Sequence, residues 1–311
     1  MPIGSSLPLP SPLNEPQAQN EKARKNAINF QLSEPKYTFD DLILPPSTLS
    51  QVNKALAFRK HHDLVFKQWG LQETHRHSKR VCLNFYGAPG TGKTMTAHAV
   101  AHYLEKPLLI INYADIESKY VGDTPKNLIA AFEMAQKHDA VLFFDEADAM
   151  LSKRVTNMSN STDTSVNQTR SVLLNILNDY DKTILFATNF IENFDSAFMR
   201  RILAHVNFLL PDSECRKKLF DKYLPKEMPH QLDTKRLSEQ CENLSGSDIS
   251  NAILLGAFSA AERDSKCVDM EDIQYALKSI QDSKQANAQK ISIKTREVTQ
   301  AEVEQSLGEK L

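Results

Sequence analysis

Short apolar runs alternate with longer segments of helical periodicity through the middle of this chain. Five runs have the length and the apolar, β-branched character of buried strands: residues 81–86, 108–112, 140–144, 183–187 and 203–209. Between them, segments such as 93–104 and 125–138 space their apolar residues as one face of a helix does. Strands that alternate with helices form a parallel sheet covered by helices, so the pattern predicts an α/β fold.

The pattern changes at Pro211, because strand-like runs stop there and only helical patterns follow, in residues 213–223, 233–242, 247–263 and 269–280. We therefore expect an α/β domain over 37–210 and a small helical domain over 211–285. Residues 1–36 are rich in Pro, Ser and Asn and are expected to form a flexible leader, and residues 286–311 a polar tail. A Thr/Asn/Ser-rich stretch at 155–169 is predicted to be a loop within the α/β domain.

Composition narrows the class of protein only slightly. The 311 residues carry 37 basic and 39 acidic side chains, and this near-neutral balance argues against a dedicated binder of nucleic acid or of membrane surfaces. The four cysteines lie far apart, which predicts neither a zinc site nor a disulfide framework. Neither a signal peptide nor a membrane-spanning run is recognisable, so a cytoplasmic protein is expected.

The strongest chemical signal is a phosphate-binding loop at residues 87–94, which read Gly-Ala-Pro-Gly-Thr-Gly-Lys-Thr. The motif follows a predicted strand and precedes a predicted helix, which is the context that it requires. Its glycines allow backbone N–H groups to surround phosphates at the positive end of the following helix. Lys93 is expected to reach the β- and γ-phosphates of ATP, and the Thr94 hydroxyl to bind Mg²⁺.

Two further predicted strands end in polar residues that suit the same reaction. The run at 140–144 leads into Asp145 and Glu146. Asp145 is expected in the Mg²⁺ shell, and Glu146 is expected to polarise the attacking water. The run at 183–187 is followed by Asn189, which by itself would more often be a turn former. Its place after the fourth strand favours a role in holding that water.

Arg200 and Arg201 follow the segment Phe-Asp-Ser-Ala-Phe-Met at 194–199. Paired arginines most often form a solvated face. Because a guanidinium is permanently charged and can grip phosphate oxygens, the alternative is an arginine finger supplied to a neighbouring subunit.

Together these motifs resemble the AAA+ family of ATPases over about residues 37–280. The resemblance implies a P-loop NTPase domain with a five-stranded parallel sheet, a C-terminal helical lid, ATP and Mg²⁺ as ligands, and a homo-hexameric ring. It places the phosphate loop contacts at Gly87, Pro89, Gly90, Thr91, Gly92, Lys93 and Thr94.

The resemblance also implies adenine contacts at Asp41 and Ile43, where Leu-Pro-Pro at 44–46 replaces a common glycine pair. The lid turn containing Gly246 and Ser247 is similar to that of protein-remodelling members, which place it near the adenine. The second sensor position of other branches carries no arginine here, and this favours a protein remodeller.

The segment Lys119, Tyr120 and Val121 is similar to the pore loop of AAA unfoldases, in which an aromatic ring contacts a polypeptide through area rather than through specific hydrogen bonds. A lone tyrosine more commonly packs on its own domain. Residues 156–168 occupy the position of a second pore loop, and Arg170 just beyond it is expected to face the next subunit.

The sequence thus predicts an ATP-hydrolysing ring motor that unfolds or remodels a protein. By analogy with bacterial HORMA-domain remodellers, its partner is a single adaptor or signalling protein of that kind. Two alternatives stay open: a loader or helicase helper acting on nucleic acid, and a scaffold gated by nucleotide.

Overall fold

The computed structural model describes residues 30–74, 81–117, 123–152, 161–190 and 194–294. Its sheet has the strand order β1-β3-β4-β5-β2-β6. The five longer strands run parallel and comprise β2 (Val81–Gly87), β3 (Leu108–Asn112), β4 (Val141–Asp145), β5 (Thr183–Thr188) and β6 (Ala204–Phe208). This confirms the predicted five-stranded parallel α/β fold.

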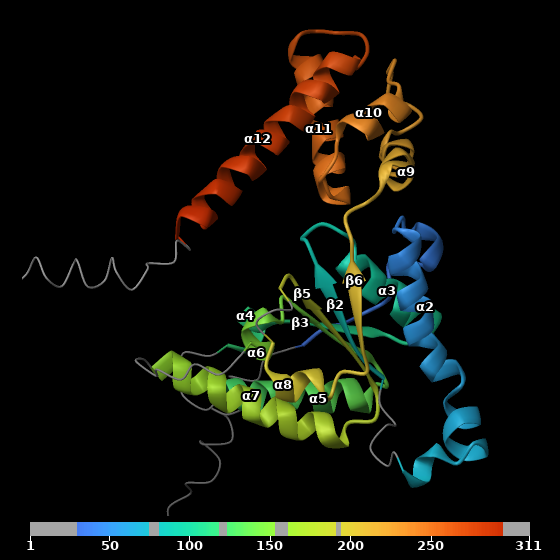
Figure 1. Cartoon of the computed structure of the whole chain (residues 1–311), viewed down its shortest axis with the longest axis vertical. Coiled ribbons are helices and arrows are strands. Elements are labelled where there is room, and N and C mark those ends of the chain that lie inside the picture. Colours follow the sequence, from blue (N-terminus) through green and yellow to red (C-terminus); the bar gives the residue numbers. More distant parts are fainter. Residues whose placement is uncertain (1–29, 75–80, 118–122, 153–160, 191–193, 295–311) are drawn as a thin grey trace, which may run out of the picture.

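Alternate residues of these strands face two separate hydrophobic clusters. One face packs on α2 (Pro46–Lys60) and α3 (Lys93–Tyr103), and the other on α5 (Asp123–Lys137), α7 (Ser161–Asp179) and α8 (Ser196–Met199) (Figure 1). In β4, for example, Phe143 belongs to the first cluster and Phe144 to the second. Because helices cover both faces of the sheet, the strand sequences are continuous apolar runs.

Short elements connect these layers. They are the 3₁₀ turns Phe39–Asp41 and Leu71–Glu73, the π-helical turn Leu64–Gln68, and the short helices α4 (Tyr113–Ile116) and α6 (Asp148–Leu151). No helix in the described ranges is both long enough and apolar enough to cross a bilayer.

The four C-terminal helices form a separate lid above the carboxyl end of β6 (Figure 1). They are α9 (Ser213–Tyr223), α10 (Thr234–Gln240), α11 (Gly246–Glu262) and α12 (Met270–Lys294). Their buried residues make a third hydrophobic cluster that includes Phe220, Leu237, Ile249 and Ile273. The predicted helical patterns match these elements, except that α12 continues from the predicted end at 280 to Lys294.

Three parts of the chain differ from the sequence-based expectations. The two-residue strand β1 (Leu32–Ser33) pairs antiparallel with β3, and Phe30 is buried in the same cluster as α5, so the described end of the expected leader packs on the sheet. Helix α2 was not predicted. The loop expected at 155–169 is wrong over its second half, because α7 begins at Ser161.

Candidate nucleotide-binding site

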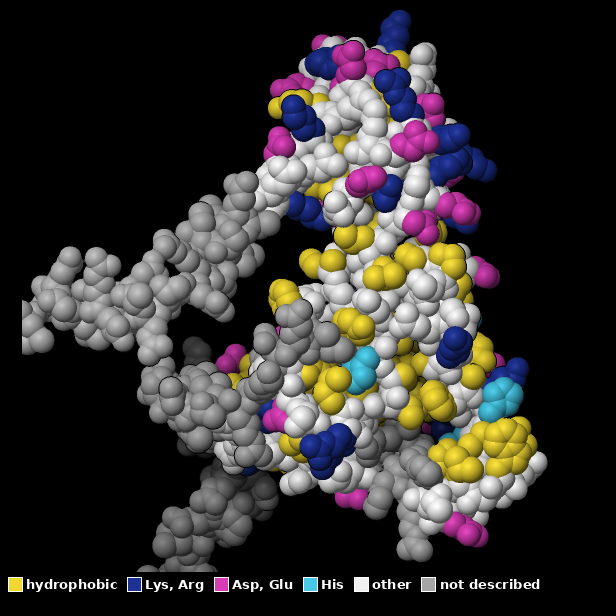
Figure 2. All heavy atoms as spheres, in the orientation of Figure 1, with side chains coloured by type: hydrophobic (Ala, Val, Ile, Leu, Met, Phe, Trp, Pro, Cys, Tyr) yellow, Lys and Arg dark blue, Asp and Glu magenta, His cyan; other side chains and the backbone are white. Residues whose placement is uncertain are grey.

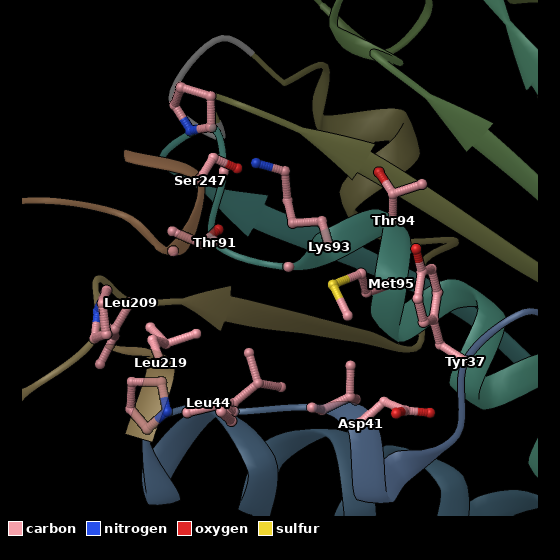
Figure 3. A pocket seen from close by; sticks show the side chains of 18 of the residues that line it. Tyr37, Asp41, Leu44, Thr91, Lys93, Thr94, Met95, Leu209, Leu219 and Ser247 are labelled. Atoms are coloured by element: carbon pink, nitrogen blue, oxygen red, sulfur yellow. The ribbon is translucent and has the colours of Figure 1, made fainter. Parts of the chain in front are cut away.

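A cavity of about 560 Å³ lies at the carboxyl ends of β2, β4 and β5, beneath the lid. Open α/β sheets place their ligand sites at this edge. In Figure 3, Lys93 and Thr94 lie on one side of the hollow and Asp41 and Leu44 on the other. Residues from the phosphate loop, two strand ends, the lid and the segment 37–45 (the N-terminal arm) therefore meet at one site.

Three glycines of the phosphate loop have positive φ angles: Gly87 at 141°, Gly90 at 76° and Gly92 at 98°. A Cβ at Gly87 would lie 2.3 Å from the Phe208 carbonyl oxygen, and a Cβ at Gly90 would lie 2.6 Å from the Ser245 Oγ. Other residues would be strained at such angles and would clash there. The predicted loop is thus built on glycines that the backbone path requires.

The Lys93 ammonium group lies inside this loop. Its Nζ donates to the carbonyl oxygens of Gly87 (2.7 Å) and Ala88 (3.0 Å) and to Asn189 Oδ1 (3.1 Å), and the residue is 8% exposed. Burial lowers the pKa of Lys93, while the charges of Asp145 and Asp148 oppose that shift. Lys93 and Asn189, the asparagine expected to hold the attacking water, are therefore in direct contact.

Thr94 and Asp145, the two residues expected to bind Mg²⁺, are in contact in the structure. The Thr94 hydroxyl donates to Asp145 Oδ2 at 2.8 Å. A hydroxyl beside a carboxylate is an oxygen donor set that suits Mg²⁺, which is commonly bound by one or two carboxylates together with substrate phosphates. The residues present therefore fit this ion.

Glu146 lies next to this pair and also lines the cavity. Its backbone N–H donates to Asp145 Oδ1 at 3.0 Å, and its φ is 51°, in the left-handed region that non-glycine residues rarely adopt. Such strained residues cluster at functional sites. The turn thus places one carboxylate against Thr94 and leaves the next one at the cavity wall.

Asp148 is a site residue to which the sequence analysis gave no role. Its carboxylate accepts from the backbone N–H groups of Asn189 and Phe190, each at 3.2 Å, and so fixes the polar tip of β5 against α6. The signal was present, because Asp148 is the third acid of the Asp-Glu-Ala-Asp run at 145–148. It positions the asparagine that contacts Lys93.

The expected adenine contacts, Asp41 and Ile43, both line the cavity, together with Leu44 and Pro45. The carboxylate of Asp41 accepts from the backbone N–H (2.9 Å) and the hydroxyl (3.0 Å) of Thr38, and these bonds lower its pKa. Leu44 occupies part of the space near the phosphate loop, since a Cβ on Gly92 would lie 3.4 Å from it.

The lid closes the other side of this cavity. Gly246 and Ser247 line it at the first turn of α11, and the Ser247 N–H donates to the Gly90 carbonyl at 3.3 Å. Ser245 and Asp248 cap this helix reciprocally. Lys222 of α9 donates to the Asp41 carbonyl at 2.6 Å, so the lid also holds the N-terminal arm. Nucleotide in this cavity would contact both domains.

The paired arginines lie outside the cavity lining of their own chain. Arg201 donates to Asn178 Oδ1 and to the Ala197 carbonyl, each at 3.0 Å. The Arg200 side chain is exposed, and within the described ranges the structure gives this side chain no hydrogen bond or ion pair. The two arginines are therefore not equivalent, and Arg200 is the one that points to solvent.

The expectation that Arg170 faces a neighbouring subunit is wrong. Arg170 is 2% exposed and forms an ion pair with Asp195 of its own chain. The predicted pore residues Lys119, Tyr120 and Val121 lie outside the described residues, as does the first part of the expected second pore loop at 156–168.

Comparison with known proteins agrees with this site. Residues 83–210 match the model of the AAA family, the ATPase family associated with various cellular activities. The proteasome-activating nucleotidase of Methanosarcina mazei is 32% identical over 214 residues, which are 66% of this chain and 50% of that protein. A 26S proteasome regulatory subunit 4 homolog of Encephalitozoon cuniculi is 29% identical over 81% of this chain and 59% of its own length.

A third relative is a 26S proteasome regulatory subunit 8 homolog B of Arabidopsis thaliana, 28% identical over 78% of this chain and 58% of that protein. The chain thus spans between half and three fifths of the length of these relatives. Both the matched segment and the phosphate-loop geometry lie in the α/β domain. Residues 83–210 therefore resemble the AAA ATPase family in sequence, and in the structure they carry a phosphate loop with the geometry of a nucleotide-binding site.

Proposed function

We propose that this protein hydrolyses ATP and uses the resulting motion of its lid to remodel a protein substrate. One observation carries the proposal: a single cavity joins the phosphate loop and the lid to Lys93, Glu146 and Asn189. A protein that only bound nucleotide would need the loop and the lid, but it would have no need of a second carboxylate at the cavity wall beside the Thr94–Asp145 pair.

Different side chains of the site have different roles in the proposed hydrolysis. Lys93 supplies positive charge to the terminal phosphates, and Asn189 keeps its ammonium group in place through the 3.1 Å contact. Glu146 accepts a hydrogen bond from the attacking water, orients this water in line with the γ-phosphate and takes up its proton as it attacks. Mg²⁺ held by Thr94 and Asp145 would neutralise charge on the β- and γ-phosphate oxygens.

Arg200 is the residue that we propose completes this site in a second copy of the chain. It lies outside the cavity of its own chain and is exposed, whereas Arg201 is held by Asn178. An arginine in trans stabilises the charge that spreads over the transferred phosphoryl group. This arrangement requires assembly, and a closed homo-hexameric ring is the form that we propose.

Exposed hydrophobic side chains support the proposed assembly. Leu254, Leu255 and Phe258 on α11 are each at least half exposed. Figure 2 shows hydrophobic side chains at the surface where the lid meets the α/β domain. Contiguous exposed apolar surface commonly marks protein interaction sites.

The remodelling part of the proposal is supported by Tyr120 and by relatives named as proteasome regulators. Lid closure on nucleotide would move one domain against the other and so move the predicted pore residues. An aromatic ring at a channel wall would then pull a polypeptide of any sequence.

Tyr120→Ala is expected to remove substrate remodelling and to leave basal ATP hydrolysis largely intact, because Tyr120 is not a phosphate or water ligand. The measurement is ATP-dependent unfolding of a fluorescent protein with an unstructured tail, alongside phosphate release. Tyr275→Ala is the matched control, since Tyr275 is exposed on the lid. If Tyr120 packs within its own domain instead, the variant should lose about 3–5 kcal/mol of stability. Normal remodelling by a stable Tyr120→Ala protein would contradict the proposed grip.

A further inference from the structure

Arg170 of α7 is among the largest fully buried side chains in the described part of the chain. Its Nη2 lies 2.9 Å from Asp195 Oδ2, and its guanidinium carbon lies 6.0 Å from the centroid of the buried Phe198 ring. Burial of a charged group is costly unless a partner of opposite charge is placed well. The ion pair therefore fixes the position of Asp195 relative to α7.

Asp195 is the residue from which α8 begins. Its second carboxylate oxygen, Oδ1, accepts from the Ala197 N–H at 2.8 Å and caps the helix, and its own N–H donates to the Leu151 carbonyl at 2.9 Å. Leu151 ends α6, the helix that begins at Asp148. The partly buried Asp195 carboxylate thus links α7 to the start of α8, while its backbone N–H joins α8 to the end of α6.

Helix α8 has four residues and cannot be stable by itself. Helix α7 holds it at both ends, through Arg170 to Asp195 at its start and through Asn178 to Arg201 just after its end. Arg200 is the C-cap residue of α8, lies between Met199 and Arg201, and is exposed. The contacts fix the backbone that carries Arg200 and leave its side chain directed outward.

We propose that Arg170 is a positioning residue that holds α8 so that Arg200 reaches the nucleotide of a second copy. The inference rests on the proposed trans role of Arg200. Arg170 thereby differs from residues that act on the nucleotide of their own chain. Its loss would impair the neighbouring nucleotide site and leave the site of its own chain intact.

Arg170→Met is expected to lower the ATP turnover of the assembled protein by roughly 10²-fold, the usual cost of misplacing a catalytic group by about 1 Å. The apparent affinity for ATP should stay unchanged, because no group of its own cavity is altered. Since Arg170→Met leaves the partly buried Asp195 carboxylate without its ion-pair partner, the double variant Arg170→Met/Asp195→Asn is made in parallel. Asparagine can still cap α8, and no charge is left unpaired.

The turnover of mixed subunits distinguishes a positioning role from a merely structural one, because a merely structural role would not give the following pattern of rescue. Lys93→Met subunits lack a working site of their own but keep a well-placed Arg200. When they are mixed with Arg170→Met subunits, turnover should return at about one interface in four of a randomly mixed ring. Mixed with Arg200→Ala subunits, Arg170→Met subunits should regain no turnover, because neither subunit then presents a well-placed Arg200. The double variant should behave in the same way.

The opposite pattern, in which Arg200→Ala rescues and Lys93→Met does not, would show that Arg170 serves its own site and would overturn the inference. Wild-type turnover by an assembled, folded Arg170→Met protein would overturn it as well. The control mixture of Arg200→Ala with Lys93→Met tests the trans arrangement itself. Failure of rescue in that control would refute the proposed role of Arg200, and the inference about Arg170 with it.

Discussion

Glu146→Gln is expected to slow ATP hydrolysis by roughly 10²–10⁴-fold, the usual contribution of a positioned acid–base group, with nucleotide affinity preserved. Glutamine keeps the size and the strained turn of Glu146 but cannot take up a proton from the attacking water. The polar contacts of Lys93, Thr94 and Asp145 in the cavity are unchanged. Phosphate release under single-turnover conditions and titration with a fluorescent ATP analogue measure the two effects separately.

Glu105→Gln is a matched control for this prediction. Glu105 is also exposed and also has a positive φ, of 54°, but it lies outside the nucleotide cavity. The control should hydrolyse ATP like the wild type. Hydrolysis at the wild-type rate by Glu146→Gln would remove the proposed water-orienting role and would favour the alternative of a nucleotide-gated scaffold.

Lys93→Met is expected to weaken ATP binding by roughly 10–100-fold, which corresponds to one charge-assisted hydrogen bond of about 1.5–3 kcal/mol. Methionine retains the apolar stem and removes the ammonium group that the loop carbonyls and Asn189 hold in place. Isothermal titration with Mg²⁺ and ATP measures the loss. The rise in melting temperature that ATP gives to the wild type should shrink by the same free energy.

Lys106→Met provides the comparison, because Lys106 is a partly buried lysine paired with Asp139 away from the cavity. Its nucleotide affinity should equal that of the wild type. An unchanged affinity in Lys93→Met would mean that ATP does not bind through this loop, and the proposed function would then lose its site.

The central strands and the phosphate loop could be predicted because local sequence determines them. Strands β3 and β5 are buried on both faces and read as apolar runs, and the loop glycines are dictated by backbone angles that only glycine adopts easily. Helix α2 was missed because it is largely polar and buries only a narrow set of residues, Thr48, Val52, Ala55 and Leu56. Strand β1 has two residues, too few to show an alternating pattern.

Long-range contacts account for the other differences. The Thr/Asn/Ser composition of 155–169 is typical of a loop because these side chains compete for backbone hydrogen bonds. Even so, α7 extends back to Ser161, and the buried Thr169, Arg170 and Leu173 show how closely this helix packs on the domain. The inward position of Arg170 depends on Asp195, 25 residues away, and no local pattern indicates that pairing.

Where a motif fixes the local geometry, the structure brings the predicted site residues together, while elsewhere their contacts could be predicted only in part. Lys93, Thr94, Asp145 and Asn189 meet as the strand ends suggested, since the carboxyl ends of parallel strands share one edge of a sheet. The sequence did not distinguish Arg200 from Arg201. That distinction depends on Asn178 of α7, which accepts from Arg201 and leaves Arg200 exposed.

The central claim, that ATP is hydrolysed at a site completed by Arg200 of a second copy, is tested most directly by the turnover of the wild-type protein per chain across a concentration series. Sedimentation of the same samples reports the degree of assembly. The rate per chain should rise together with the assembled fraction, and Arg200→Ala should assemble in the same way yet stay slow at every concentration. A constant rate per chain, retained at concentrations where the protein is monomeric, would contradict the claim.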